Sequence, residues 1–243
     1  MVIFLLISWL TTATAVTPAE LEAKLTAIEP YRDQRQAAGA PRLSMTQMKR
    51  TADGAVVTGL VEVAGSDTGK GYGAVLYDVP IAVLWSAIND ETRHAGYTAV
   101  GYSELLAGRA CEPGRRVFNY LEVPWVSDRW WIGLPSPNRT IMRNSAGSVR
   151  ELTFKSSVNE AEITSASAKG YQNLAYPIAF SKGAWFLVAI DARHTYAEYY
   201  VWTDPGGRIP ASLASSFATK GVKAQIDAIR KFAKEGNPSC PIE

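Results

Sequence analysis

The chain contains few residues of the types that catalyse reactions or bind metals, and their spacing matches no common motif. It has two histidines, His94 and His194, and two cysteines, Cys111 and Cys240. The histidines do not have the H-E-x-x-H spacing of a zinc-protease helix, and the cysteines do not form a C-x-x-C pair. We therefore expect no metal, no cofactor and no catalytic residue, and so a protein that is not an enzyme.

Two glycine-containing stretches look like active-site loops, one like a nucleophile elbow and one like a phosphate-binding loop, but each lacks a feature that its loop requires. The stretch "GSDTG", residues 65–69, has Asp67 at the position where a nucleophile elbow has serine. The stretch "GKGYG", residues 69–73, precedes a predicted strand. A phosphate cradle needs the N-terminal amides of a helix after its glycines. The sequence therefore predicts neither a serine hydrolase nor a nucleotide site.

The composition is that of a globular protein with a substantial core. Apolar residues make up 47% of the 243 residues and charged residues 20%, which argues against disorder. The formal net charge is only +2, too small for a nucleic-acid-binding surface. We expect a monomer that binds no nucleic acid.

The first fifteen residues, "MVIFLLISWLTTATA", form an apolar run that ends in Ala13-Thr14-Ala15. Small residues at A-x-A spacing after such a run are typical of a secretory signal peptide. The run is too short to span a bilayer comfortably. We expect cleavage after Ala15, and a mature protein, residues 16–243, in the periplasm or secreted.

The two cysteines have two interpretations. In an oxidising compartment, a disulfide between Cys111 and Cys240 would tie the C-terminal tail to a loop in the middle of the chain. The alternative is two unpaired thiols. The sequence leaves both open.

The sequence predicts two helices near the N-terminus and then a long series of consecutive strands. A helix over 17–38 precedes a hairpin over 43–65 that turns at Asp53-Gly54, then a strand over 72–80 and a helix over 80–96. Further strands are predicted over 98–107, 115–123, 128–134, 139–145, 149–158, 161–168, 175–180, 183–192 and 194–203. This order favours one strongly bent antiparallel meander. No linker divides it, so we expect residues 16–243 to form one domain.

The stretch "YYVWTDPGGRIPASLASSF", residues 199–217, predicts an abrupt change from strand to helix. Pro205 cannot donate to a ladder, and Gly206-Gly207 permits a sharp reversal. Pro210 suits a first helical turn, and the helix is expected to continue to about Lys234. Its apolar stripe comprises Ile209, Leu213, Phe217, Val222, Ile226, Ile229 and Phe232. A long helix lying back across the sheet would enclose an apolar space.

The segment "TDPGGRIPASLA" and the amphipathic helix after it resemble the C-terminal motif of START (steroidogenic acute regulatory protein-related lipid-transfer) domains. A second segment, "EVPWVSDRWWIG", residues 122–133, is similar to the Pro/Trp-rich turn of that family. The resemblance covers roughly residues 20–235. It implies an α+β helix-grip fold, in which a bent antiparallel sheet wraps around a long C-terminal helix. It also implies an internal cavity for one lipid or similar hydrophobic molecule, gated by that helix and a neighbouring loop.

The resemblance, combined with strand alternation, also selects residues that would line the cavity. Tyr199, Val201 and Thr203 share one face of their strand, whereas Tyr200 and Trp202 point the other way. The full set of expected ligand-binding residues is His94, Phe118, Tyr120, Trp125, Arg129, Trp131, Tyr199, Val201, Thr203, Leu213 and Phe217. For each aromatic residue taken singly, packing in the core is the stronger expectation.

Two polar residues of this set have competing roles. Arg129 either holds a ligand head group or braces the turn with Asp128, and we favour bracing because a buried charge needs partners. His94 lies either in the cavity, where the resemblance places polar groups, or on the surface.

The sequence thus predicts an exported protein that binds, and could transfer, a sterol, phospholipid or fatty-acyl compound, with transient contact to a membrane surface. One alternative is a cyclase- or aromatase-like enzyme acting on a polyketide-type substrate in the same cavity. The other is a protein-interaction module whose cavity is filled by its own side chains.

Overall fold

The computed structural model describes residues 15–37, 39–124, 126–207 and 211–241, and for 211–217 it describes the backbone alone. The expected signal peptide therefore lies outside the described residues, apart from Ala15. No helix in the described part of the chain is long and apolar enough to cross a membrane.

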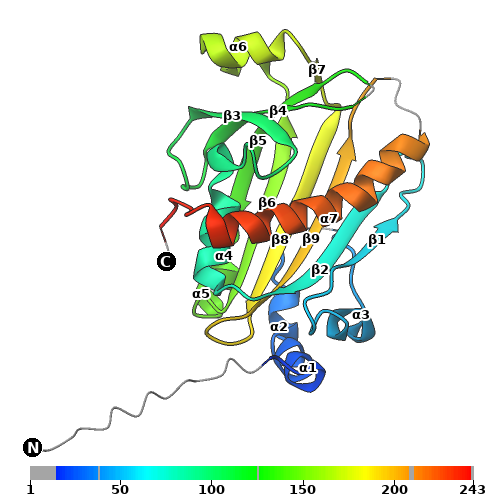
Figure 1. The fold of residues 1–243 in the computed structure, drawn as a ribbon, viewed down its shortest axis with the longest axis vertical. Helices are drawn as coiled ribbons and strands as arrows, with labels where there is room; N and C mark the ends of the chain where they lie inside the picture. Colours follow the sequence, from blue (N-terminus) through cyan, green and yellow to red (C-terminus); the bar gives the residue numbers. More distant parts are fainter. Residues whose placement is uncertain (1–14, 38, 125, 208–210, 242–243) are drawn as a thin grey trace, which may run out of the picture.

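A nine-stranded sheet forms the body of the molecule (Figure 1). The strands pair antiparallel in the order β1-β2-β9-β8-β6-β5-β4-β3, and β7 adds a short parallel pairing with β5. Their bounds are β1 Val57–Val61, β2 Lys70–Tyr77, β3 Val100–Ala107, β4 Arg116–Leu121, β5 Arg129–Pro137, β6 Val149–Ser157, β7 Tyr176–Pro177, β8 Phe180–Ala189 and β9 Thr195–Asp204.

Two helices cover one face of this sheet (Figure 1). The long C-terminal helix α7, Ala211–Glu235, runs across the strands, and α4, Ile81–Asn89, lies beside its C-terminal end. The remaining helices are α1 Pro18–Ala27, α2 Glu29–Arg32, α3 Met45–Lys49, α5 Arg139–Asn144 and α6 Ala166–Gln172, with the 3₁₀ turns η1 Glu91–Arg93 and η2 Glu160–Glu162. The first four pack on or beside the opposite face, and their side chains share a core with the outward side of the sheet.

Three segments predicted as strands contain helices, and a capping side chain begins each of these helices. Residues 45–49 are helical because Ser44 and Gln47 form a capping box. Residues 139–144 are helical because the Asn138 side chain caps Ile141 N. The third, 161–168, contains the end of η2 and the start of α6, which Ser165 caps. The predicted helix 17–38 is shorter, because α1 ends before Pro30, which has no amide to donate.

The C-terminal helix makes its most extensive contacts with β1, β2 and β9 and with α4. Its residues Val222, Ile226, Ile229 and Phe232 are fully buried against β1, β2, β9 and α4, as the apolar stripe predicts. The Tyr77 hydroxyl of β2 donates to the Ile226 carbonyl at 2.9 Å. Strands β3 to β5 curve away on the other side (Figure 1).

Close contact between α7 and β2 depends on a missing side chain. A Cβ added at Gly71 of β2 would lie 2.1 Å from the carbonyl oxygen of Ala218 on α7, a distance that no packed atoms tolerate. Glycine at this position therefore allows the two backbones to meet.

The end of α7 is fastened by the tail that follows it. A disulfide joins Cys240 to Cys111 in the loop between β3 and β4. The Ser86 hydroxyl of α4 donates to the Cys240 carbonyl at 2.6 Å, and the Ser239 amide donates to Asp90 at 2.7 Å. The C-terminal end of α7 is thus held to α4 and to the β3–β4 loop.

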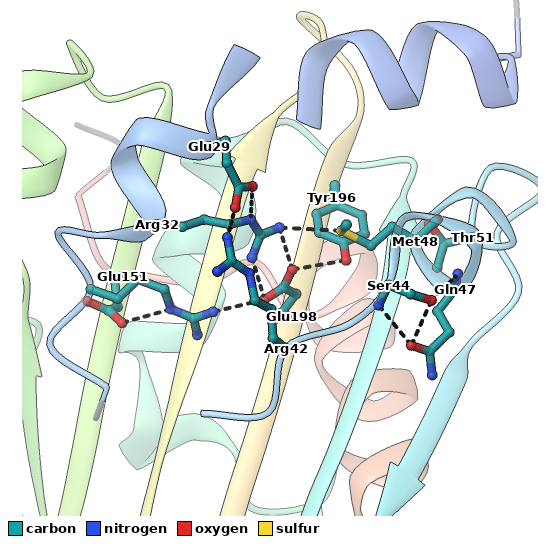
Figure 2. Close-up of polar contacts among 11 residues, drawn as sticks. Glu29, Arg32, Arg42, Ser44, Gln47, Met48, Thr51, Glu151, Tyr196 and Glu198 are labelled. Carbon is teal, nitrogen blue, oxygen red and sulfur yellow. Dashed lines mark hydrogen bonds and ion pairs between the residues drawn. The ribbon is translucent and has the colours of Figure 1, made fainter. Parts of the chain in front are cut away.

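Buried charges lie on the other face of the sheet, where Figure 2 shows them. Glu198 of β9 accepts hydrogen bonds from Arg32 at 2.6 Å and from Arg35 at 2.9 Å, and Arg35 also contacts Glu151 of β6. Burial by itself would raise the pKa of Glu198, but the two guanidinium groups outweigh it and lower that pKa. This network ties the N-terminal segment to the back of the sheet.

The packing at Gly71 generates a test of how α7 is seated. Gly71→Ala should lower the free energy of unfolding by more than 2 kcal/mol, because the added methyl meets backbone atoms. Gly221→Ala is the matched control, since a Cβ there meets nothing within 4 Å and alanine favours a helix by about 1 kcal/mol. Urea denaturation of both variants measures the difference. Equal stability of Gly71→Ala and the wild type would contradict this packing.

Candidate functional site

A cavity of about 460 Å³ lies between α7 and the face of the sheet that the helix covers. Strands β3, β4, β5, β6, β8 and β9 contribute its wall, and α4, η1 and α7 close it. Among the α7 residues whose side chains the structure describes, Ala218, Gly221 and Gln225 line the cavity, and the first two are small and leave space.

The floor of the cavity is apolar and largely aromatic. Trp185 of β8 and Tyr199 of β9 stack with ring centroids 4.4 Å apart, and Phe154 of β6 stacks on Tyr199 at 6.2 Å. Leu152 and Val201 complete this part of the lining. The Tyr199 hydroxyl has no hydrogen-bond partner among the described residues, and burial raises its pKa, so the phenol stays protonated. Such a surface suits a hydrophobic guest.

His94 lines the opposite end of the cavity, next to α4 and η1. Its Nε2 lies 2.8 Å from the Ala87 carbonyl, so this nitrogen carries the proton and donates. Phe232 meets the ring edge to face at 5.5 Å. Burial lowers the pKa of His94, and this outweighs the opposing effects of Ala87, Glu91 and Asp90.

Arg129 lines the cavity, but its guanidinium is occupied by backbone carbonyls. It donates to Pro205 at 2.6 Å, to Gly206 at 3.1 Å, and to the carbonyls of Ser127 and Asp128. Burial lowers the pKa of Arg129, partly offset by Asp128. The side chain therefore braces the turn before β5 against the turn after β9, as the favoured interpretation holds.

The other expected residues fall into three groups. Tyr199, Val201, Thr203 and Trp131 line the cavity, together with His94 and Arg129. Trp125 lies outside the described residues, and so do the side chains of Leu213 and Phe217.

Phe118 and Tyr120 form the third group, because the structure places them on the other face of β4. They pack there with Trp130 and Ile132, whereas Val117, Asn119 and Leu121 line the cavity. The expected inward face of this strand was therefore wrong by one residue, which reverses every side chain. The polar Asn119 disguised the inward face, yet its amide is satisfied by Val117 O and by the Ser103 hydroxyl.

Sequence reasoning missed the floor residues Leu152, Phe154 and Trp185. Strand β8 is apolar on both faces over "AWFLVA", so alternation gave no sign of which side chains point inward. No group of three or more His, Cys, Asp or Glu residues within the described chain could hold a metal ion.

Comparison with known proteins finds the fold among solved structures. No family model matches the chain, and neither does any curated protein. A STAR-related lipid transfer protein fragment from Xanthomonas axonopodis is similar, with 20% identity over 74% of this chain and 94% of that chain, and a TM-score of 0.60. Human StAR-related lipid transfer protein 5 is 12% identical over 90% of this chain and 97% of that chain, with a TM-score of 0.57.

A third structure, human STARD10, is 15% identical over 82% of this chain and 84% of that chain, with a TM-score of 0.55. The protein thus has the START-like helix-grip fold, which confirms the predicted fold class.

The buried imidazole predicts how stability depends on pH. Its pKa is lower in the folded protein than the ordinary 6.5, so below that pH the unfolded chain binds more protons. Stability from neutral His94 is complete above about pH 6.5 and is lost as the pH falls toward the folded pKa. Thermal melts between pH 7.5 and 5 should show a steeper loss for the wild type than for His94→Gln. Identical slopes would contradict the lowered pKa.

Proposed function

We propose that this protein binds a hydrophobic small molecule of lipid type in the cavity under α7. The observation that carries the proposal is the apolar cavity of about 460 Å³ with its aromatic floor. A guest that buries roughly 300 Å² of apolar surface would gain on the order of 7 kcal/mol before the costs of binding. Two of the similar structures are lipid transfer proteins, which supports the same ligand class.

Several polar side chains in the cavity already form hydrogen bonds within the protein, which fits a binding protein better than an enzyme. Glu91 accepts two hydrogen bonds from Arg115, at 2.6 and 2.8 Å, and Asn119 and Arg129 are likewise occupied. A general acid or base needs a free position from which to reach a substrate. Glu91, Asn119 and Arg129 have no such position, and we favour a carrier in which the free polar atoms of the cavity bind the ligand.

Loading and release would take place at the N-terminal end of α7. The other end of the helix is held by the disulfide and by the bonds of Ser86 and Ser239. The N-terminal end follows the turn that Arg129 braces through backbone carbonyls alone. We propose that this end lifts when the protein transiently contacts a membrane, so that the ligand can pass.

Export belongs to the same proposal. The disulfide between Cys111 and Cys240 supports an oxidising compartment, where such bonds persist. The apolar run that ends at Ala15 would direct the chain there and then be removed.

A substitution on the cavity floor tests the binding site. Val201→Phe should fill part of the cavity and weaken binding of the fluorescent fatty acid cis-parinaric acid at least ten-fold, while Val201→Ala should leave binding within about three-fold. Fluorescence titration gives both constants, and thermal melts verify that each variant folds. Equal binding by the wild type and Val201→Phe would refute this site.

N-terminal sequencing tests export. When the full chain is expressed in a bacterial host, the protein recovered from the periplasm or medium should begin at Val16. An intact N-terminus on a protein that stays in the cytoplasm would contradict the proposal.

A further inference from the structure

The chemistry of one ring nitrogen in the cavity wall, Nδ1 of His94, restricts the ligand, because this atom has no hydrogen-bond partner among the described residues. The residue is only 8% exposed and lines the cavity. Among the described residues, the ring's one hydrogen bond is the bond from Nε2 to the Ala87 carbonyl.

The Ala87 carbonyl fixes what Nδ1 can do. Since a carbonyl only accepts, Nε2 must carry the proton, and in a neutral imidazole Nδ1 is then an acceptor with a free lone pair. Phe232 packs against the ring and holds its plane. In the neutral ring, Nδ1 cannot become a donor without the loss of the Ala87 bond.

The charged residues around the His94 ring do not donate a hydrogen bond to its Nδ1. Glu91 binds Arg115 at 2.6 Å, and Asp90 accepts from Ser239. Asp90 and Glu91 would favour a protonated His94, whereas Arg115 and above all burial disfavour it. The neutral ring, with its acceptor at Nδ1, is the form that a ligand meets.

We propose that the ligand is a lipid alcohol, a hydrophobic skeleton with a hydroxyl group, and that this hydroxyl donates a hydrogen bond to Nδ1 of His94. The inference rests on the proposed lipid-binding function and adds the chemical class of the ligand. A buried acceptor that loses water and gains no donor is penalised. An ether of the same skeleton could fill the cavity but could not satisfy Nδ1.

Matched ligands test this directly. The first pair is dodecan-1-ol and its methyl ether, and the second is cholesterol and its methyl ether, so that a chain and a fused-ring skeleton are compared. Each competes with cis-parinaric acid for the full mature chain. In the wild type at least one alcohol should bind about three- to ten-fold more tightly than its ether, which is the strength of one hydrogen bond. In His94→Phe that preference should disappear.

Tyr199→Phe is the comparison variant, because the Tyr199 hydroxyl is another cavity group without a hydrogen-bond partner among the described residues. It should keep the preference for the alcohol. If Tyr199→Phe loses the preference and His94→Phe keeps it, the proposal is overturned in favour of the tyrosine.

A measurement on the wild type removes any dependence on how the variants fold. The chain has two histidines, so nitrogen NMR resolves both rings, and His194 lies on the turn between β8 and β9. The Nδ1 resonance of His94 should move upfield when the alcohol binds and stay in place when the ether binds.

The outcomes separate the two proposals. If no member of either pair displaces the probe and the probe itself does not bind, the lipid-binding function fails. If alcohol and ether bind equally and the His94 signal does not respond, the lipid-binding function stands and the hydroxyl proposal is wrong.

Discussion

The packing of α7 against β1, β2 and β9 is the constraint on which the rest of the structure depends. Gly71 lets the helix backbone approach β2, and four fully buried apolar side chains hold it there. The helix packs against β1, β2 and β9, and the cavity lies between Ala218, Gly221 and Gln225 of the helix and the sheet. A bulkier residue at Gly71 or a larger one at Ala218 would change the size of that space, so helix placement and ligand capacity are set together.

The two faces of the sheet carry different groups: a salt-bridged cluster lies on the back, and the aromatic cavity floor lies on the front. The salt-bridged cluster of Arg32, Arg35, Glu151 and Glu198 lies on the back, where it fastens the N-terminal segment. The front carries the stacked aromatic rings of the cavity floor. Strand alternation makes this division automatic, since Glu198 and Tyr199 are neighbours on β9 and point to opposite faces. The charged side chains of this cluster therefore do not enter the cavity.

Sequence reasoning predicted the architecture well and the cavity wall only in part. The motif around Asp204-Pro205-Gly206 and the apolar stripe of the last helix predicted a long helix lying back across the sheet, and the resemblance to START domains implied the helix-grip fold. The inward face of β4 was predicted wrongly, because Asn119 is polar yet points inward, and its satisfaction depends on Ser103 of the neighbouring strand. The floor residues of β8 were missed because a strand that is apolar on both faces carries no alternation. Which face of such a strand points inward depends on its contacts with neighbouring strands and helices, and the local sequence does not show these contacts.

The central claim is that the cavity holds a hydrophobic molecule, and native mass spectrometry with solvent extraction tests it most directly. The mature chain would be exported by its host, purified without detergent, and weighed under native and denaturing conditions. We expect a native mass above the denatured mass by one small molecule per chain, and recovery of that molecule in the organic extract. A single native mass equal to that of the bare chain, unchanged after incubation with a panel of lipids, would contradict the account.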